Sequence, residues 1–250
     1  MQQGRATARM KGNWQQQLCP RALGALAMSY PDKEMSSNLT KRLHALPASI
    51  VHDVMRAQGL GQMVLPPTIR PIAPGSKLTG PAFTVSGRAV QDHDAHETLL
   101  AWTAMLSRVP AGHVLVMQPN DNSVAHMGEL SAEALTLRGV LGAIIDGGCR
   151  DVDRINAVGL PVFCRYFTPL DVVGRWLPVA FGEPVTIGDW TIATCDFVVA
   201  DTDGICIVPR EHAAATAAAG EAAMSAENLV RTAILAGVDP ETAYRRHGKF

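Results

Sequence analysis

Long apolar runs and runs of basic residues are both missing from this sequence of 250 residues. No apolar run approaches the roughly 18–20 residues that a membrane-spanning helix needs, so we expect no membrane partner. Lys and Arg (22 residues) nearly balance Asp and Glu (23 residues), the formal net charge is −1, and no Lys/Arg run occurs. The sequence therefore offers no basic stripe for a phosphate backbone, and no nucleic-acid partner is expected.

Cysteine is scarce and follows no pairing pattern. The five cysteines are odd in number, widely spaced and without a C-x-x-C pair: Cys19, Cys149, Cys164, Cys195 and Cys206. This pattern argues against a disulfide framework and a structural zinc site, and it indicates a reducing cytoplasm as the location of the protein.

Hydrophobic residues, by contrast, make up 47% of the chain, enough for one sizeable core. Residues 1–36 lack periodicity and begin Gln/Arg/Gly-rich, so we expect a poorly ordered N-terminal extension, with Met35 as a candidate true start. The apolar stretch 22–28 follows basic residues, but Pro20 and Arg21 break it up and no cleavage site for a signal peptide stands out. Residues 37–250 are expected to form a single domain.

Strand and helix patterns alternate in the middle of the chain. The expected elements are strand 82–89, helix 95–107, strand 113–118, helix 128–139, strand 140–145, helix 151–158 and strand 161–165. Such alternation predicts parallel βαβ units in a sheet with both faces covered.

The flanking regions add helices and short strands. Two helices are expected after residue 37, the second running from Ser49, as its N-cap, to Gln58. Beyond Pro178 the expected elements are strands 184–187, 191–193, 197–200 and 204–208, an Ala-rich helix 210–236 and a last helical turn after residue 239. The fold class is therefore α/β, a mixed central sheet with flanking helices.

Two glycine-containing turns lie where strands lead into helices, which is where α/β proteins bind ligands. The first, at 126–131, reads His-Met-Gly-Glu-Leu-Ser; its glycine permits close approach to the backbone, and the amides at a helix start face an anion. The second, at 146–151, reads Asp-Gly-Gly-Cys-Arg-Asp and places a cation and a carboxylate side by side.

This last pair has a chemical interpretation. Arg150 can bind a substrate carboxylate through two hydrogen bonds. Asp151 offers a hard oxygen ligand suited to Mg²⁺ or Mn²⁺, which keep several waters and take few protein carboxylates. Spacing alone leaves open the alternative that Asp151 is only a helix N-cap and Arg150 only a surface charge.

A wider set of motifs carries a family resemblance. In chain order they are Asp53, Gly80-Pro81-Ala82, Thr84-Val85, Pro110-Ala111-Gly112-His113-Val114-Leu115-Val116, Gly128-Glu129-Leu130, Asp146-Gly147-Gly148-Cys149-Arg150-Asp151, Pro161-Val162-Phe163 and Asp201-x-Asp203-Gly204. In their order and spacing, from about residue 37 to the C-terminus, the chain resembles the 4-hydroxy-4-methyl-2-oxoglutarate/4-carboxy-4-hydroxy-2-oxoadipate aldolases and the RraA-like regulators of ribonuclease E activity.

The resemblance implies a swivelling β/β/α domain assembled into homotrimers or homohexamers, with active sites between neighbouring subunits. It implies Asp151 as the residue that holds a divalent metal, Mg²⁺ or Mn²⁺, largely through waters. It also implies that Arg150 and Asp151 are the catalytic residues and that Arg150 binds the pyruvyl group. A Glu of the neighbouring C-terminal helix, Glu221 or Glu227, is a candidate to approach the metal. The substrate-binding residues that it implies are Gly128, Glu129, Leu130, Ser131 and Arg150.

The implied activity is that of a class II aldolase, which cleaves 4-hydroxy-2-oxo acids to pyruvate through a metal-stabilised enolate and also decarboxylates oxaloacetate. Neither motif contains a lysine, so a Schiff-base aldolase is not expected. One alternative is a non-catalytic regulator that binds ribonuclease E or a related RNA-processing protein. Another is a metal-dependent enzyme that acts on a different hydroxy or oxo acid. A methyltransferase is not supported, because no glycine-rich nucleotide loop is found.

The charged segment 92–97, Asp-His-Asp-Ala-His-Glu, has three open interpretations. His93 and His96 beside acidic residues could hold a metal, the segment could line the substrate pocket, or it could be an acid-rich first turn that complements a helix dipole. Its charge exceeds the family pattern, which indicates a different substrate.

Four further residues have candidate roles. His126 is either a substrate contact or a loop histidine without a role. Cys149 has no histidine partner nearby in sequence and is interpreted as a small loop residue. Asp201 and Asp203 are expected to shape a turn between strands.

Overall fold

The computed structural model describes residues 33–61 and 63–248. The expected N-terminal extension falls mainly on residues outside this part of the chain and stays a prediction. Helix α2 (Lys33–His44) begins upstream of residue 37, so the first helix is longer than its sequence pattern indicated. None of the described helices is long and apolar enough to cross a membrane.

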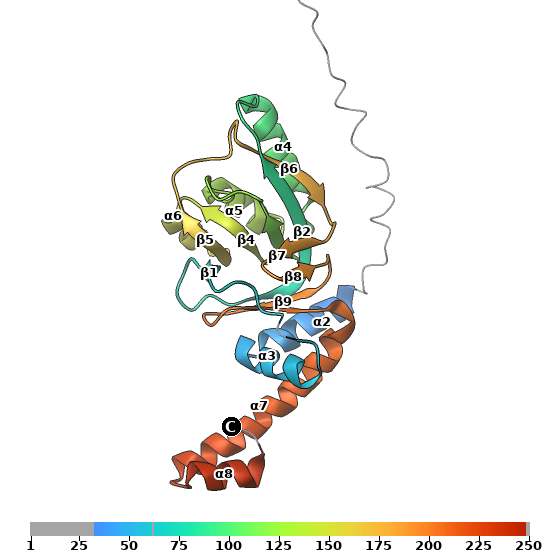
Figure 1. Cartoon of the computed structure of the whole chain (residues 1–250), viewed down its shortest axis with the longest axis vertical. Coiled ribbons are helices and arrows are strands. Elements are labelled where there is room, and N and C mark those ends of the chain that lie inside the picture. The colour runs from blue at the N-terminus through green and yellow to red at the C-terminus, as the bar shows by residue number, and fades with distance from the viewer. Residues whose placement is uncertain (1–32, 62, 249–250) are drawn as a thin grey trace, which may run out of the picture. The chain divides into compact units, whose positions relative to one another are not determined.

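The described strands form one eight-stranded mixed sheet and one separate hairpin (Figure 1). In the sheet the order is β1-β5-β4-β3-β2-β9-β10, with β6 also paired to β2; the hairpin joins β7 and β8. The strands are β1 (Arg70–Pro71), β2 (Leu78–Ala89), β3 (Val114–Gln118), β4 (Gly142–Cys149), β5 (Val162–Phe167), β6 (Trp176–Phe181), β7 (Val185–Ile187), β8 (Trp190–Ile192), β9 (Phe197–Ala200) and β10 (Ile205–Val208).

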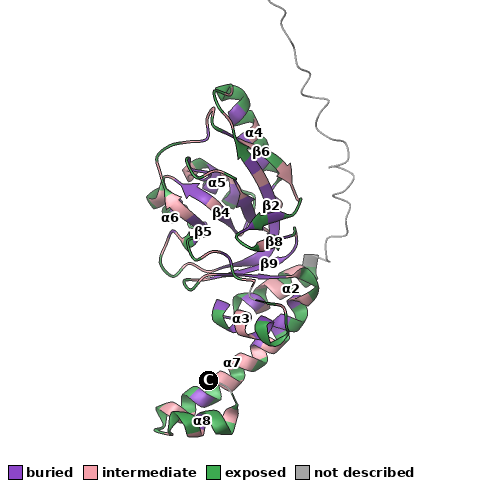
Figure 2. Ribbon diagram, viewed as in Figure 1, coloured by how far each residue is buried: buried purple, intermediate pink, exposed green. Residues whose placement is uncertain are grey.

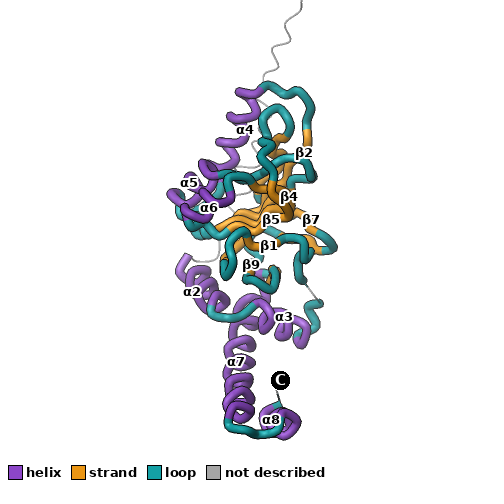
Figure 3. Tube along the Cα trace, turned by 90° about the vertical axis from the view of Figure 1, so that its left-hand side faces the viewer, coloured by secondary structure: helices purple, strands orange, loops and turns teal. Residues whose placement is uncertain are grey.

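Strands β2 to β5 are parallel neighbours, and three helices connect them: α4 (Ala95–Arg108), α5 (Glu129–Leu137) and α6 (Val152–Val158). These helices bury Trp102, Leu135 and Ile155 against Leu115 and Ile145 of the sheet. Figure 3 shows all three helices on one side of the strands. The predicted βαβ units are therefore confirmed.

Strands rather than helices cover the other face of the parallel sheet. Val114 and Ile144 pack there against Ile187, Val198 and Ile205 from the later strands. As a result the central strands are buried on both faces, as Figure 2 shows for β2 and β4. The sequence predicted that both faces are covered. This second face is covered by the curled end of the sheet and by the β7–β8 hairpin.

A second helical layer packs on β9 and β10. It consists of α2, α3 (Ala48–Ala57) and α7 (Ala213–Leu235), which bury Leu43, Val51 and Ala217 against Phe197 and Val208. A 3₁₀ turn, η2 (Arg210–His212), precedes α7, and α8 (Pro240–His247) follows it. The expected α/β fold, a mixed sheet with flanking helices, is confirmed.

Two details of the sequence interpretation are wrong. Ser49 does not cap α3: the helix starts at Ala48, whose N–H donates to the Asp201 carboxylate at 2.8 Å. Sequence reading favoured the local residue because the true acceptor lies far along the chain. Asp201 also accepts from Asp203 N at 3.0 Å, so the expected turn is confirmed.

The second error concerns the glycine pair 147–148, which was expected to follow the strand. Strand β4 continues through both glycines to Cys149, with a register shift against β5 between Ile145 and Gly148. A Cβ on Gly148 would lie 2.4 Å from the Tyr166 ring. Glycine occupies these positions because neighbouring side chains fill the space that a Cβ atom would need.

Gly87 gives a test of this packing. A Cβ at Gly87 would lie 1.9 Å from Cζ2 of Trp176, which is fully buried and donates from Nε1 to Pro119 O at 2.9 Å. We expect Gly87→Ala to lower the free energy of unfolding by about 1–3 kcal/mol, because the ring has no space into which to move. Urea denaturation measures the change. Arg88→Ala, on the exposed next residue, should change stability by less than about 0.5 kcal/mol. Equal stabilities of the two variants would contradict this account.

Candidate functional site

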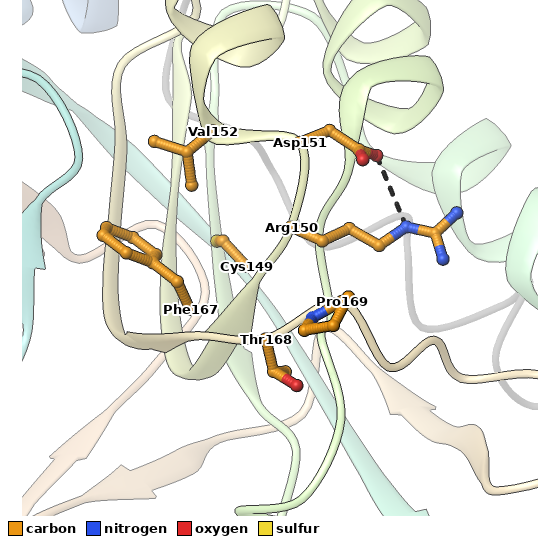
Figure 4. Close-up of a pocket in the computed structure, with 7 residues that line it drawn as sticks. All are labelled: Cys149, Arg150, Asp151, Val152, Phe167, Thr168 and Pro169. Atoms are coloured by element: carbon orange, nitrogen blue, oxygen red, sulfur yellow. Dashed lines mark ion pairs between the residues drawn. The ribbon is translucent and has the colours of Figure 1, made fainter.

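A cavity of about 330 Å³ lies at the carboxyl ends of β4 and β5. Its lining comes from two segments, the end of β4 with the start of α6 and the end of β5 with the loop after it (Figure 4). The lining residues are Cys149, Arg150, Asp151, Val152, Phe167, Thr168 and Pro169. The structure thus brings the predicted Arg150-Asp151 pair to the edge of the sheet where α/β folds bind ligands.

Asp151 has an unusual backbone conformation, with φ 54° and ψ 37° in the left-handed region. It precedes α6, yet its side chain makes no capping hydrogen bond to that helix. Instead, Oδ2 accepts from Glu129 N at 3.3 Å, at the start of α5. Asp151 therefore occupies the N-cap position of α6, but its side chain does not cap that helix. The left-handed conformation of Asp151 costs roughly 1 kcal/mol. With this conformation, the carboxylate points toward the start of α5.

Gly128 makes this approach possible. A Cβ at Gly128 would lie 2.9 Å from Asp151 Oδ2 and 3.3 Å from Cγ and Nε of Arg150. The glycine was expected to leave room for a ligand, and in the structure the Arg150-Asp151 pair itself lies over it. The two predicted motifs are therefore in contact, because the Arg150-Asp151 pair occupies the space that Gly128 leaves free.

Arg150 lies between two carboxylates. Its Nε is 3.3 Å from Asp151 Oδ2, and its Nη1 is 3.4 Å from Asp171 Oδ2. The Arg150 side chain is 39% exposed, so a ligand can reach it. Asp171 was not found from the sequence, because it follows β5 in a loop without any motif.

The Gly-Glu-Leu-Ser turn presents backbone rather than side chains. The Glu129 carboxylate pairs with Arg154 Nη1 at 3.1 Å, and Ser131 Oγ is buried and accepts from Trp102 Nε1 at 3.0 Å. The first helical bond of α5 runs from Ala132 N to Gly128 O, so the amides of Leu130 and Ser131 precede it. These amides lack a partner within the helix and suit an anion.

His126 is fully buried, which the sequence did not indicate. Its ring lies edge-on to Trp176, with centroids 5.3 Å apart, and neither ring nitrogen has a hydrogen-bond partner among the described residues. Nε2 is 3.4 Å from Asp121 Oδ2, but burial outweighs that attraction and lowers the pKa of His126 to about 4. The ring is therefore a neutral part of the core at neutral pH and does not contact the cavity.

Cys149 is not an activated nucleophile. It lines the cavity but is buried, and a hydrogen bond with Cys164 together with burial raises the pKa of Cys149 well above its ordinary value. A thiol needs a lowered pKa to react readily, so its interpretation as a small packing residue fits the structure.

The charged segment 92–97 caps a helix. Asp94 Oδ1 accepts from Glu97 N at 2.9 Å, and His93 Nε2 lies 3.6 Å from Glu97 Oε2. Across residues 33–61 and 63–248, no group of three or more His, Cys, Asp or Glu side chains is arranged to hold a metal ion. Of the three interpretations, the acid-rich first turn agrees with these contacts.

The two glutamates proposed for a neighbouring site lie on α7. Glu221 accepts two hydrogen bonds from Arg42, at 2.7 and 2.8 Å, and Glu227 pairs with Arg231 at 2.6 Å. Both carboxylates are thus engaged within the chain, and a role toward a second subunit stays a prediction.

The sequence is similar to one protein-family model and to two known proteins. Residues 48–207 match the family model described as RraA-like, Aldolase/RraA. Protein DlpA of Legionella pneumophila is 24% identical over 218 residues, or 85% of this chain, and the chain spans only 34% of that protein's length. A Halalkalibacterium halodurans protein, provisionally named 4-hydroxy-4-methyl-2-oxoglutarate aldolase, is 24% identical over 172 residues, covering 68% of this chain and 75% of that protein.

Among solved structures, that of Streptomyces coelicolor RraAS2 shares the fold with a TM-score of 0.70 and 26% identity. It covers 81% of this chain and 98% of its own. RraAS2 is described as an unusual member of the RNase ES inhibitor RraA protein family. The similar proteins thus include one named as an enzyme and one named as an inhibitor.

The left-handed backbone at Asp151 can be tested with two substitutions that both remove the carboxylate. We expect Asp151→Gly to be more stable to urea than Asp151→Ala by about 1 kcal/mol, because only glycine adopts this conformation freely. Asp153, two residues along and within helix α6, is the matched control. There the order should reverse, since alanine favours a helix over glycine by about 1 kcal/mol. The same order at both positions would contradict the assigned conformation.

His126 predicts a pH dependence of stability. Below pH 6.5 the unfolded chain protonates this histidine, whereas the folded protein does so only near pH 4. The free energy of unfolding should therefore fall between pH 6.5 and pH 4, by up to about 3 kcal/mol. Urea denaturation across this range should give a flatter profile for His126→Gln, which cannot gain the charge. Parallel profiles would show that His126 is not buried in its neutral form.

Proposed function

The chain belongs to the RraA-like family, and from that premise we propose that it is a divalent-metal-dependent lyase that cleaves 4-hydroxy-2-oxo acids to pyruvate. The observation that carries the proposal is the placement of Asp151. Its carboxylate is held at the cavity by a left-handed backbone, beside Arg150 and the start of α5. Residues held in sparsely populated backbone conformations cluster at active sites and ligand-binding sites, which supports this assignment.

Asp151 fits a magnesium or manganese ion. Its carboxylate is 38% exposed, accepts a long backbone hydrogen bond from Glu129, contacts Arg150, and lies at the cavity with no second carboxylate in the lining. Mg²⁺ is often bound through one or two carboxylates while it keeps several waters, so a single ligand on this chain suits that ion. When bound there, the cation would supply positive charge next to the oxygens of the 2-oxo acid.

The remaining groups bind and orient the substrate. Arg150 would donate to the carboxylate of the pyruvyl part, and the amides of Leu130 and Ser131 would receive the same anion. Gly128 and Glu129 belong to this proposed substrate site because their backbone lies against Asp151. Held this way, the substrate breaks its C3–C4 bond, and the electron pair of that bond stays on C3.

The proton balance completes the reaction. The C4 hydroxyl loses its proton as C4 becomes a carbonyl, and C3 later gains a proton to give pyruvate. Decarboxylation of oxaloacetate leaves the same electron pair on C3, with CO₂ as the departing group, so we propose it as a side activity. The seven lining residues include no lysine, which supports this mechanism over a Schiff-base aldolase.

We also propose a homotrimer or homohexamer, with a neighbouring subunit completing each site, and a cytoplasmic location. The four described cysteines are free and buried, in keeping with a reducing compartment. The second candidate function is a regulator that binds ribonuclease E or a related RNA-processing protein. The similarity to RraAS2 favours it, and the two functions use one fold.

The direct test is pyruvate release from oxaloacetate with Mg²⁺ or Mn²⁺. We expect turnover well above the free-metal background, and a loss on the order of 100-fold with EDTA or in Asp151→Gly, because removal of a cation that stabilises charge costs several kcal/mol. Asp153→Asn, outside the cavity lining, is the matched control and should keep its activity.

The opposite result also has a clear meaning. Absence of turnover with both metals, in protein that denatures cooperatively, would reject the lyase for this substrate class. Capture of purified ribonuclease E by the same preparation would then support the regulator.

A further inference from the structure

One wall of the cavity is apolar. Phe167, at the end of β5, is 60% exposed, and it lines the cavity together with Val152 and the buried Cys149. Figure 4 shows these three side chains on one side, with the Arg150 guanidinium pointing away from them. An isolated exposed phenylalanine needs no explanation elsewhere on a surface. Here it lies in the same cavity as Asp151, where it can contact a bound molecule.

The positive charges near the cavity are already matched by carboxylates. Arg150 is the one cation among the seven lining residues, and it contacts both Asp151 and Asp171. The arginines that adjoin these groups are paired as well. Arg175 lies 3.7 Å from Asp171, and Arg154 lies 3.1 Å from Glu129.

Within the described part of the chain, the cavity lining therefore offers a second substrate carboxylate no cation besides Arg150. That carboxylate would lie against the aromatic ring of Phe167, where loss of hydration is costly. An apolar group in the same place would remove the exposed face of the ring from water, which is favourable in proportion to the area covered. The cavity volume, at the low end for ligand pockets, suits a small substrate.

We propose that the preferred substrate is a 4-hydroxy-2-oxo acid with a single carboxylate, whose C4 carries an aromatic or branched alkyl group that packs on Phe167 and Val152. The inference rests on the proposed lyase function and assigns its substrate class. For 4-hydroxy-2-oxo-4-phenylbutanoate the C3–C4 bond breaks and C4 leaves as benzaldehyde. The electron pair and then a proton go to C3, giving pyruvate.

The test compares this compound with 4-hydroxy-4-methyl-2-oxoglutarate, which carries a second carboxylate and gives two pyruvates. Oxaloacetate serves as the reference for the metal site. With the full chain and Mg²⁺, we expect kcat/KM to be on the order of 10-fold higher for the phenyl compound. Phe167→Ala should lower the ratio of kcat/KM for the phenyl compound to that for oxaloacetate by about 10-fold. Leu137→Ala, another exposed apolar residue outside the lining, should leave both ratios unchanged.

Binding gives a readout that does not need catalysis. Calorimetric titration should show phenylpyruvate binding more tightly than 2-oxoglutarate, with the preference reduced in Phe167→Ala. If oxaloacetate is not turned over, the lyase proposal fails and the substrate class fails with it, whereas this titration separately shows whether the cavity prefers an apolar group to a second carboxylate.

Two outcomes would overturn the inference while the lyase stands. One is turnover of oxaloacetate combined with a preference for the dicarboxylate. The other is a changed oligomeric state of Phe167→Ala, measured by sedimentation, without a change in either ratio. In that second case a neighbouring copy of the chain covers the ring.

Discussion

The close approach of Asp151 to Gly128 joins two connections of the sheet into one site. The first leads from β3 to α5, and the second leads from β4 to α6. Because Asp151 is left-handed, its carboxylate turns away from its own helix and toward the start of α5. Arg150 follows the same path and lies next to Gly128. Any side chain at Gly128 would separate the two connections, so the positions of the Arg150 and Asp151 side chains depend on this contact.

The surroundings of this contact divide the cavity by polarity. Asp151 and Arg150 present charged atoms beside the backbone amides at the start of α5. Across the cavity, Phe167 and Val152 form an apolar surface. The apolar wall combines Phe167 from the end of β5 with Val152 from the segment that also carries Arg150 and Asp151. The carboxyl ends of two neighbouring parallel strands thus present both a polar and an apolar surface to a small ligand.

The sequence predicted the parts of this architecture that depend on local pattern. Alternating strands and helices gave the βαβ units, and the motif residues gave the family and the Arg150-Asp151 pair. It could not predict that Asp201 caps α3 or that Asp171 contacts Arg150, because each contact joins segments distant along the chain. The burial of His126 was hidden for the same reason. The roles of Arg150 and Asp151 in catalysis stay predictions, since the structure gives their positions and not their chemistry.

Strand β2 carries a consequence for synthesis of the chain. On one edge it pairs with β3, which follows soon after it, and on the other with β9 and β6, which are made much later. During translation at roughly 5–20 residues per second, that second edge stays open for several seconds while its partners are still missing. An open, apolar strand edge invites pairing with other chains. The nascent protein is therefore most prone to aggregate between completion of β5 and arrival of β9, and a chaperone that shields the β2 edge would act in that interval.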